Sequence, residues 1–314
     1  MARVILLRFV SSVVLFILVP TVTFFVQTLT PGEVARSVLG IGATQEQIDA
    51  FNHRLGLDSP PLERYFDWLR HFSQGDLGNS YITGQPVSEI LGSRIGVSMS
   101  LVIGALLVYS AVGIVIGVGS SVGGRVWGRV VDLVSTIGIA IPNFWLAVIL
   151  ISAFAVSLGV LPAIGYVPLS ESPSGWLVSL ILPVVALAFG GITSVAKQAR
   201  DRMIATLDSP HTGVLRANGV SEASLVFKHA LRNSAGPVIT VLGLNFVGAL
   251  SGSVVIENIF VLPGLGSQAI TSTANRDLPV IQGIAVYFTV IVVVVNIIID
   301  VIVPLLNPKV RRSS

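Results

Sequence analysis

The segment GVLRANGVSEASLVFKHALRN, residues 213–233, is the most polar run in the second half of an otherwise apolar chain. Of the 314 residues, 53% are hydrophobic and only 11% are charged. The mean hydropathy is +0.85. These values lie far from the balance of soluble domains and are typical of a polytopic membrane protein. A polar run in this setting predicts a loop between membrane-spanning helices.

Six long stretches of the sequence carry no charged side chain. A charge at the bilayer centre costs roughly 2.5–3.5 kcal/mol on insertion scales, so such stretches are candidate spans. Each exceeds the ~20 residues that a helix needs to cross the hydrocarbon. The first is too long for the core of a secretory signal, so we expect it to be retained. The sequence predicts an all-α fold with six transmembrane helices, within residues 9–30, 95–124, 133–170, 172–196, 233–256 and 278–299.

Basic residues concentrate in alternate loops between these spans. By the positive-inside rule those loops and both termini are expected to be cytoplasmic. The segment at 213–233 then lies on the cytoplasmic side. The cytoplasmic set comprises Arg3, Arg8, Arg125, Arg129, Lys197, Arg200, Arg202, Arg216, Lys228, Arg232, Lys309, Arg311 and Arg312.

The longest outer segment, residues 31–94, has the signals of short helices rather than of disorder. Thr44 and Gln47 form a capping box, and Gly56 is a stop for the helix that this box begins. The run SQGDLGNS, residues 73–80, predicts a turn, and Pro86 predicts a third short helix that leads into the second span.

The second of these short helices starts at Ser59 and Pro60. Its apolar residues recur at helical spacing on one face, and we expect this face to help seat a partner protein on a small packed cap. The face comprises Leu62, Tyr65, Phe66 and Leu69.

The inner loop has a helix, glycine, helix pattern. Ser209 is a good N-cap and Pro210 a good first helical residue, so a helix of about nine residues is expected to run to Asn218, where Gly219 supplies a left-handed stop. Ser221 caps a second helix, with Glu222 in its first turn and basic residues near its end: Lys228, His229 and Arg232. Geometry alone leaves two interpretations open, a solvated connector or a helix about 13 Å long that docks in a groove of another protein.

The inner loop resembles a known family. RANG at 216–219 and HALRN at 229–233, followed by Pro237, are similar to the cytoplasmic EAA loop of ATP-binding-cassette (ABC) importer permeases, in the form of the dipeptide and oligopeptide permease B subunits. Further motifs match that family in order and spacing over nearly the whole chain: LGLDSPP (55–61), GDLGNS (75–80), GIAIPNFW (138–145), VVIENIFVLPGLG (254–266), RDLPVIQG (276–283) and LLNPKVR (305–311).

The resemblance implies the type I importer permease fold and a role for each polar segment. Residues 1–95 would form the first span and the extracytoplasmic cap, and residues 96–314 the permease core, with a coupling-helix loop at about 197–236. The coupling helix would sit in a cleft of an ATPase subunit, with Arg216, Ala217, Gly219 and Leu231 at the motif positions. Gly213 replaces the glutamate that begins the general motif, which weakens the helix by up to ~1 kcal/mol.

A second set of residues is assigned by the same resemblance. Glu257 lies at the outer end of the fifth span, and the following NIFVLPGLG run is expected to form a turn in the gate region with Pro263, Gly264 and Gly266. A proton relay through Glu257 is the weaker alternative. The residues that line the substrate path stay unassigned.

Several kinds of chemistry are excluded by what the sequence lacks. There is no GK dipeptide and hence no Walker A loop, so we expect no ATPase activity in this chain and no cofactor of its own, with ATP and Mg²⁺ bound by partner subunits. There is no cysteine, and the four histidines lack zinc-ligand spacing, so we expect no metal site. These histidines are His53, His71, His211 and His229.

Other polar and small residues within the spans have structural interpretations. Asn296 and Asp300 lie one turn apart in the last span, where interhelical bonding is favoured over substrate contact. Pro142 allows a bend. Small residues allow close helix packing at Gly104, Gly113, Gly117, Gly243, Gly248 and Gly252.

Together these features predict one half of a membrane pore in the bacterial cytoplasmic membrane. The resemblance implies a second related permease, two ATPase subunits and an extracytoplasmic substrate-binding protein as partners, and alternating access driven by ATP. A di- or oligopeptide is the expected cargo, with a nickel chelate or glutathione as alternatives. A secondary transporter is the rival class, but the sequence shows no inverted repeats, broken helices or charged midplane residues.

Overall fold

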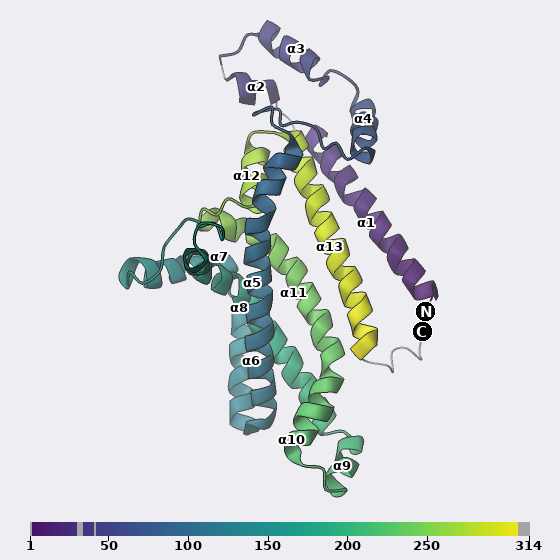
Figure 1. The fold of residues 1–314 in the computed structure, drawn as a ribbon, viewed down its shortest axis with the longest axis vertical. Coiled ribbons are helices and arrows are strands. Elements are labelled where there is room, and N and C mark those ends of the chain that lie inside the picture. The colour runs from purple at the N-terminus through teal and green to yellow at the C-terminus, as the bar shows by residue number, and fades with distance from the viewer. Residues whose placement is uncertain (1, 30–33, 41, 307–314) are drawn as a thin grey trace. The chain divides into compact units, whose positions relative to one another are not determined.

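The computed structural model describes residues 2–29, 34–40 and 42–306, and these form helices with one isolated β-bridge between Asn79 and Pro86 (Figure 1). The predicted all-α class is confirmed. The helices are α1 (Ala2–Leu29), α2 (Val34–Leu39), α3 (Gln45–Arg54), α4 (Pro61–Ser73), α5 (Val87–Val122), α6 (Gly124–Ala140), α7 (Asn143–Leu150), the π-helix η1 (Ile151–Ser157), α8 (Pro173–Leu207), α9 (Pro210–Ala217), α10 (Glu222–Ser224), the π-helix η2 (Leu225–Ala230), α11 (Leu231–Ile259), α12 (Leu265–Ala274) and α13 (Leu278–Leu306).

Five helical segments of the described chain are long and apolar enough to cross a membrane. They are Val10–Thr28, Val87–Val122, Pro173–Leu207, Glu222–Ile259 and Leu278–Val303. A sixth candidate is a bent pair, Val126–Ala140 with Asn143–Ser157. The count of six spans therefore holds when the bent pair is one span.

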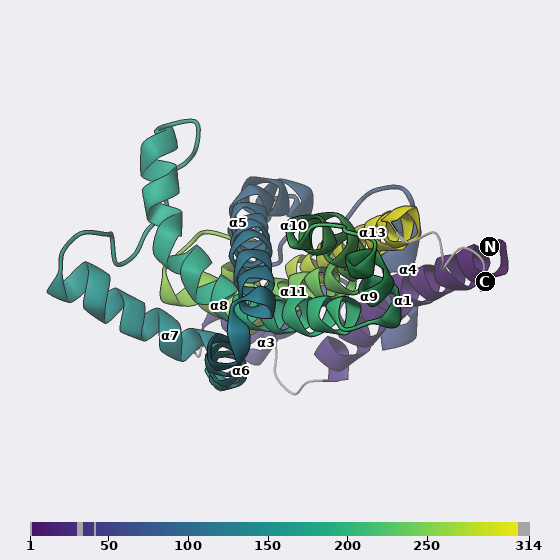
Figure 2. The ribbon, with the colours of Figure 1, turned by 90° about the horizontal axis from the view of Figure 1, so that it is seen from below.

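The bend in the third span is sharper than the sequence suggests. The two halves meet at 98°, and Figure 2 views α6 nearly end-on with α7 leading away from it. Pro142 is the N-cap of α7 and has no N–H to continue the ladder of α6. The residue before it, Ile141, has the extended backbone that a following proline favours. The expectation that no helix is broken was therefore wrong at this position.

Three other predicted boundaries differ from the structure because neighbouring helices are continuous. The helix predicted to start at Pro86 is the first part of α5, and α8 continues from the predicted span end at Ala196 to Leu207. The helix capped by Ser221 does not end near Arg232, because α10, η2 and α11 form one run to Ile259. Charged side chains mark where a span leaves the apolar region, but they do not stop a helix.

The chain forms two compact units. Of the described residues, the first contains 98–262 and 294–306, and the second contains 2–29, 34–40, 42–97 and 263–293. Within the first unit α8 packs against α6, α7 and α11. Close approach depends on glycine: a Cβ at Gly117 of α5 would lie 2.6 Å from the Cβ of Ala199, and one at Gly243 of α11 would lie 1.9 Å from Cδ1 of Ile299.

Gly104, Gly113 and Gly252 also lie against a neighbouring helix, as predicted, but Gly248 does not. A Cβ at Gly248 would meet no atom within 4 Å. The packing role expected of Gly248 was wrong.

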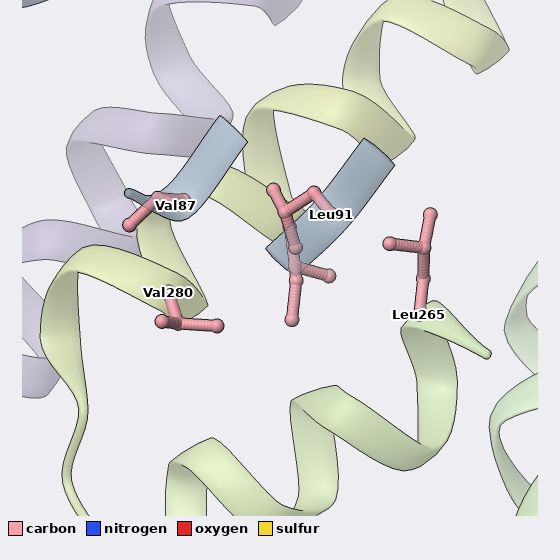
Figure 3. Packing of buried hydrophobic residues seen from close by; sticks show 5 residues of the cluster. Val87, Leu91, Leu265 and Val280 are labelled. Atoms are coloured by element: carbon pink, nitrogen blue, oxygen red, sulfur yellow. The ribbon is translucent and has the colours of Figure 1, made fainter. Parts of the chain in front are cut away.

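The second unit has two small apolar cores. Figure 3 shows the first, where Val87 and Leu91 of α5 lie with Leu265 of α12 and Val280 of α13. The second joins α2 and α3 through Ala35, Ile48 and Phe51. The predicted capping box of α3 is present, since Thr44 Oγ1 accepts from the Gln47 amide and Gln47 Oε1 accepts from the Thr44 amide.

The α4 helix packs on α1 through aromatic rings. Tyr65 lies 5.4 Å from Phe24 between ring centroids, and its hydroxyl lies 2.6 Å from Thr21 Oγ1. Trp68 stacks on Phe72 at 5.2 Å. The predicted apolar face is therefore divided: Tyr65 turns toward α1, whereas Leu62 and Phe66 are each 58% exposed and Leu69 is exposed beside them.

Candidate functional site

The loop between α8 and α11 has the predicted helix, glycine, helix arrangement. Ser209 caps α9, and its Oγ accepts a hydrogen bond from the Thr212 amide at 3.4 Å. Pro210 is the first residue of α9, and Asn218 is its C-cap. These signals are local, and for that reason the sequence alone identified this helix.

Gly219 ends α9 with a φ of +80°. In that left-handed region only glycine has no steric cost. The Val220 amide donates to the Leu215 carbonyl at 3.1 Å and closes the turn. Ser221 then caps α10, accepting from the Ser224 amide at 3.4 Å.

An ion pair spans this turn. The Arg216 guanidinium forms two hydrogen bonds with the Glu222 carboxylate, one of them from Nη2 to Oε2 at 3.1 Å. Hydrogen bonding to the Glu222 carboxylate raises the pKa of Arg216 above its ordinary value. Both side chains are exposed, and the pair therefore orients the turn more than it stabilises the fold.

The four residues predicted for coupling do not share one surface. Arg216, Ala217 and Gly219 are exposed along the end of α9. Leu231 instead packs against a buried cluster of Met203, Val226 and Ala230. Leu231 thus stabilises the loop through its contacts with this buried cluster.

An apolar hollow of about 840 Å³ adjoins this loop. Its wall contains the exposed side chains Val115 and Val122 of α5 and Phe227 of η2. The hollow also includes Leu207 and Asp208 at the end of α8, and Glu222 and Ala223 of α10. The loop therefore presents an exposed polar turn beside exposed apolar side chains.

Glu257, predicted for the gate region, is fully buried near the end of α11. Its Oε1 accepts a hydrogen bond from Ser98 Oγ of α5 at 2.6 Å. A buried carboxyl group is costly unless it is hydrogen-bonded, and this bond meets part of that cost.

The turn after Glu257 has an unusual residue at its key position. Val261 has a φ of 55°, although a β-branched side chain is strained there. The Leu262 amide donates to the Glu257 carbonyl at 2.8 Å and the Val261 amide to Asn258 at 3.3 Å, which together form a Schellman cap. No sequence signal marks this strained valine, because a glycine is the usual signal for such a cap.

The other predicted gate residues belong to the second unit. Gly264 is the N-cap of α12, and Gly266 is buried in its first turn. Pro263 precedes them and is exposed. These residues start α12 and place Leu265 in the core shown in Figure 3.

Comparison with known families shows which protein family the chain belongs to. Residues 110–312 match the family described as "Binding-protein-dependent transport system inner membrane component", and residues 1–102 match the N-terminal model of such membrane components. The chain belongs to this family. It is a multi-pass inner-membrane permease of an ABC importer, a class that works with an ATPase and a substrate-binding protein.

Named relatives match this permease over its full length. A Brucella abortus protein named as a peptide transport system permease is 37% identical over 99% of both chains. The dipeptide transport system permease DppB of Lactococcus lactis is 32% identical over 99% of this chain and 100% of its own. The glutathione transport system permease GsiC of Salmonella choleraesuis is 33% identical over 99% of both.

A solved structure supports the fold of the permease. A chain of the MetNI methionine ABC transporter, crystallised in inward-facing conformations, has a TM-score of 0.50 and 18% identity to it. The match covers 70% of this permease and 94% of that chain. The predicted importer permease fold is confirmed.

The second unit of the permease contains a buried carboxylate that the sequence analysis left without a role. Asp277 is buried and accepts hydrogen bonds from Ser80 Oγ and, at 2.9 Å, from the Tyr81 amide. Ser80 ends the GDLGNS motif, and Asp277 belongs to RDLPVIQG. The two motifs were recognised separately, and the fold joins them.

A second ion pair links two helices of the permease in the first unit. Arg200 Nη1 of α8 lies 2.9 Å from both carboxylate oxygens of Asp132 on α6. A Cβ at Gly128 would lie 2.3 Å from Arg200 Nη2, so the glycine makes room for the guanidinium. From the sequence, Arg200 was only a marker of orientation.

In the part of the permease that the structure describes, no group of three or more histidine, cysteine, aspartate or glutamate side chains could hold a metal ion. The predicted pair of Asn296 and Asp300 is partly buried on α13.

Proposed function

We propose that this permease forms half of the translocation pathway for di- or oligopeptides. The observation that carries the cargo assignment is full-length similarity, at 37% and 32% identity, to relatives named for peptide and dipeptide transport. Relatives named for glutathione transport are 33% identical, and glutathione is therefore the second candidate.

The partners in this proposal are a second related permease, two ATPase subunits and an extracytoplasmic substrate-binding protein. Both termini lie in the cytoplasm, as the basic residues of alternate loops favour. Residues 1–95 supply the first span and the outer cap, and residues 96–314 the core with its cytoplasmic loop at about 197–236.

In this proposal α9 transmits the movement of the ATPase subunits to the membrane spans. Arg216, Ala217 and Gly219 are exposed on this short helix and its turn, as a docking surface requires, while Leu231 anchors the loop against the cluster beneath it. Closure of the ATPase dimer would move α9 and with it the adjoining ends of α8 and η2. The turn that follows Glu257, with Pro263, Gly264 and Gly266, would belong to the outer gate.

ATP binding and hydrolysis reside in the partner subunits. The sequence has no phosphate-binding loop, so ATP and Mg²⁺ bind outside this chain. The chain is the mechanical element of the importer and not its enzyme.

The test is uptake of a labelled dipeptide by proteoliposomes that contain the complete transporter with its binding protein. We expect ATP-dependent uptake that unlabelled dipeptides compete away and glutathione does not. Competition by glutathione alone would assign the second candidate, and uptake without ATP would contradict the importer mechanism.

A further inference from the structure

A cavity of about 270 Å³ lies within the first unit, among α5, α6, α7, α8 and α11. Its polar walls include Tyr109 of α5, Asn143 of α7, Ser194 of α8 and Asn245 of α11. Asn245 lies 14 residues from each end of α11, Leu231 and Ile259, and thus about 21 Å from either end at 1.5 Å per residue. The cavity is therefore at the middle of α11.

The polar side chains of this cavity make few and long hydrogen bonds within the protein. Asn245 Nδ2 donates to Ser194 Oγ, and the Tyr109 hydroxyl to the Leu242 carbonyl, both at a long 3.4 Å. Within the described residues the side chain of Asn143 makes no hydrogen bond. Carboxamides at the centre of a membrane span need partners, so these groups are available to a ligand or to water.

The cavity is lined by uncharged residues, and two of them carry side-chain amides. Asn143 and Asn245 each offer an N–H₂ donor and a carbonyl acceptor, and no residue of the lining carries a formal charge at neutral pH. A peptide bond presents the complementary N–H and C=O. A carboxylate or ammonium group would find no opposite charge here, and burying it would be costly.

We propose that this cavity is a translocation subsite that binds the backbone amide of the cargo rather than its charged termini. The proposal rests on the peptide transport proposed above. The volume, about 270 Å³, lies just below the ~300–1,000 Å³ of small-molecule sites, which suits a short piece of peptide backbone. Recognition of the amide would be independent of the cargo's side chains.

Two glycines allow the cavity to be filled without disturbing the fold. A Cβ at Gly248 would meet no atom within 4 Å, and one at Gly190 would meet only Asn143 Oδ1 at 3.8 Å. The neighbouring Gly191 is unsuitable, because its Cβ would lie 2.7 Å from the Tyr109 ring. Gly248→Leu therefore adds apolar atoms at the cavity wall from a position where the Cβ itself meets no neighbour.

The first experiment measures uptake of labelled dialanine by the complete transporter. We expect Gly248→Leu to lower the uptake rate at least tenfold, while assembly with the ATPase and ATPase activity remain. Gly92→Leu is the matched control, since Gly92 is an exposed helical glycine of α5 that also has nothing within 4 Å and lies outside the cavity. This control should transport at the unmodified rate.

A second experiment detects occupancy directly. The chain has no cysteine, so Gly248→Cys supplies its single thiol. In the solubilised permease–ATPase complex without binding protein, millimolar dialanine should slow labelling by a small water-soluble thiol reagent several-fold. The ester analogue, which lacks the amide N–H, should protect less, and Gly92→Cys should not be protected by either.

The outcomes separate the two proposals. Failure of the unmodified transporter to take up dialanine contradicts peptide transport. Normal uptake by Gly248→Leu, or labelling of Gly248→Cys that dialanine does not slow, overturns the cavity assignment whatever the cargo. Equal protection by dialanine and its ester analogue would overturn recognition of the amide.

Discussion

Gly219 is the residue on which the loop geometry depends most. Its φ of +80° costs a β-branched side chain roughly 1–3 kcal/mol, so Gly219→Val should reorient α9. We expect a folded permease that retains less ATPase subunit on affinity purification and has little uptake. Gly219→Asn is the control, because asparagine tolerates the left-handed region, and it should keep most activity. Full ATPase retention by Gly219→Val would make the loop a plain connector.

Asp277 is a second single residue with a large expected effect, because it accepts hydrogen bonds from Ser80 and Tyr81, which are distant in the sequence. Asp277→Ala would leave the buried Ser80 hydroxyl and the Tyr81 amide without their acceptor, at a cost of about 1–3 kcal/mol. The thermal midpoint of the purified permease in detergent should fall, and Asp277→Asn should recover part of the loss. Removal of an exposed aspartate, Asp58→Ala, should leave the midpoint unchanged.

At the scale of the element, α4 has two different faces. Tyr65, Trp68 and Phe72 pack toward α1, whereas Phe66 is exposed. If the exposed face seats the binding protein, Phe66→Asp should weaken binding-protein affinity and uptake without lowering the thermal midpoint, since Phe66 is not in the core. Phe66→Leu keeps the surface apolar and should behave as the unmodified permease. Unchanged affinity and uptake in Phe66→Asp would remove the docking role.

The ion pair between Asp132 and Arg200 joins two helices, α6 and α8. Asp132→Asn should loosen α6 from α8, because Arg200, which is mostly buried, then loses its closest charged partner and keeps only Asp201 of its own helix, at 3.8 Å. We expect ATPase activity of the complex that is less dependent on loaded binding protein. Measurement of ATPase activity with and without binding protein checks this, and an unchanged ratio would contradict it.

For the whole molecule, the prediction concerns which subunit hydrolyses ATP. The purified chain alone should hydrolyse no ATP, and the assembled complex should, because a nucleotide loop is missing here. A malachite-green phosphate assay on both preparations measures this. Turnover by a contaminant-free preparation of the single chain would contradict the division of labour between subunits.

Local signals account for what could be predicted of the fold. Charge-free stretches located the spans, and Ser209, Gly219 and the Thr44–Gln47 capping box defined helix ends, because each acts within a few residues. The separate short helix expected after Pro86 and the helix ends expected near Ala196 and Arg232 were wrong for one reason. A helix continues through charged residues when nothing breaks its backbone, and hydropathy does not report that continuity.

The sequence by itself determined the class, the spans and the exposed helix, glycine, helix loop, since hydrophobicity, capping and charge are properties of short segments. The tertiary structure alone decided which distant residues meet. Ser80 and Asp277 are 197 positions apart, and Asn143, Ser194 and Asn245 come from three helices before they line one cavity. Gly243 and Gly248 look equivalent in sequence, yet one lies against Ile299 and the other lines the cavity, where a Cβ would meet no atom within 4 Å. The direction a helix face takes is set by packing with its neighbours, and no short segment encodes it.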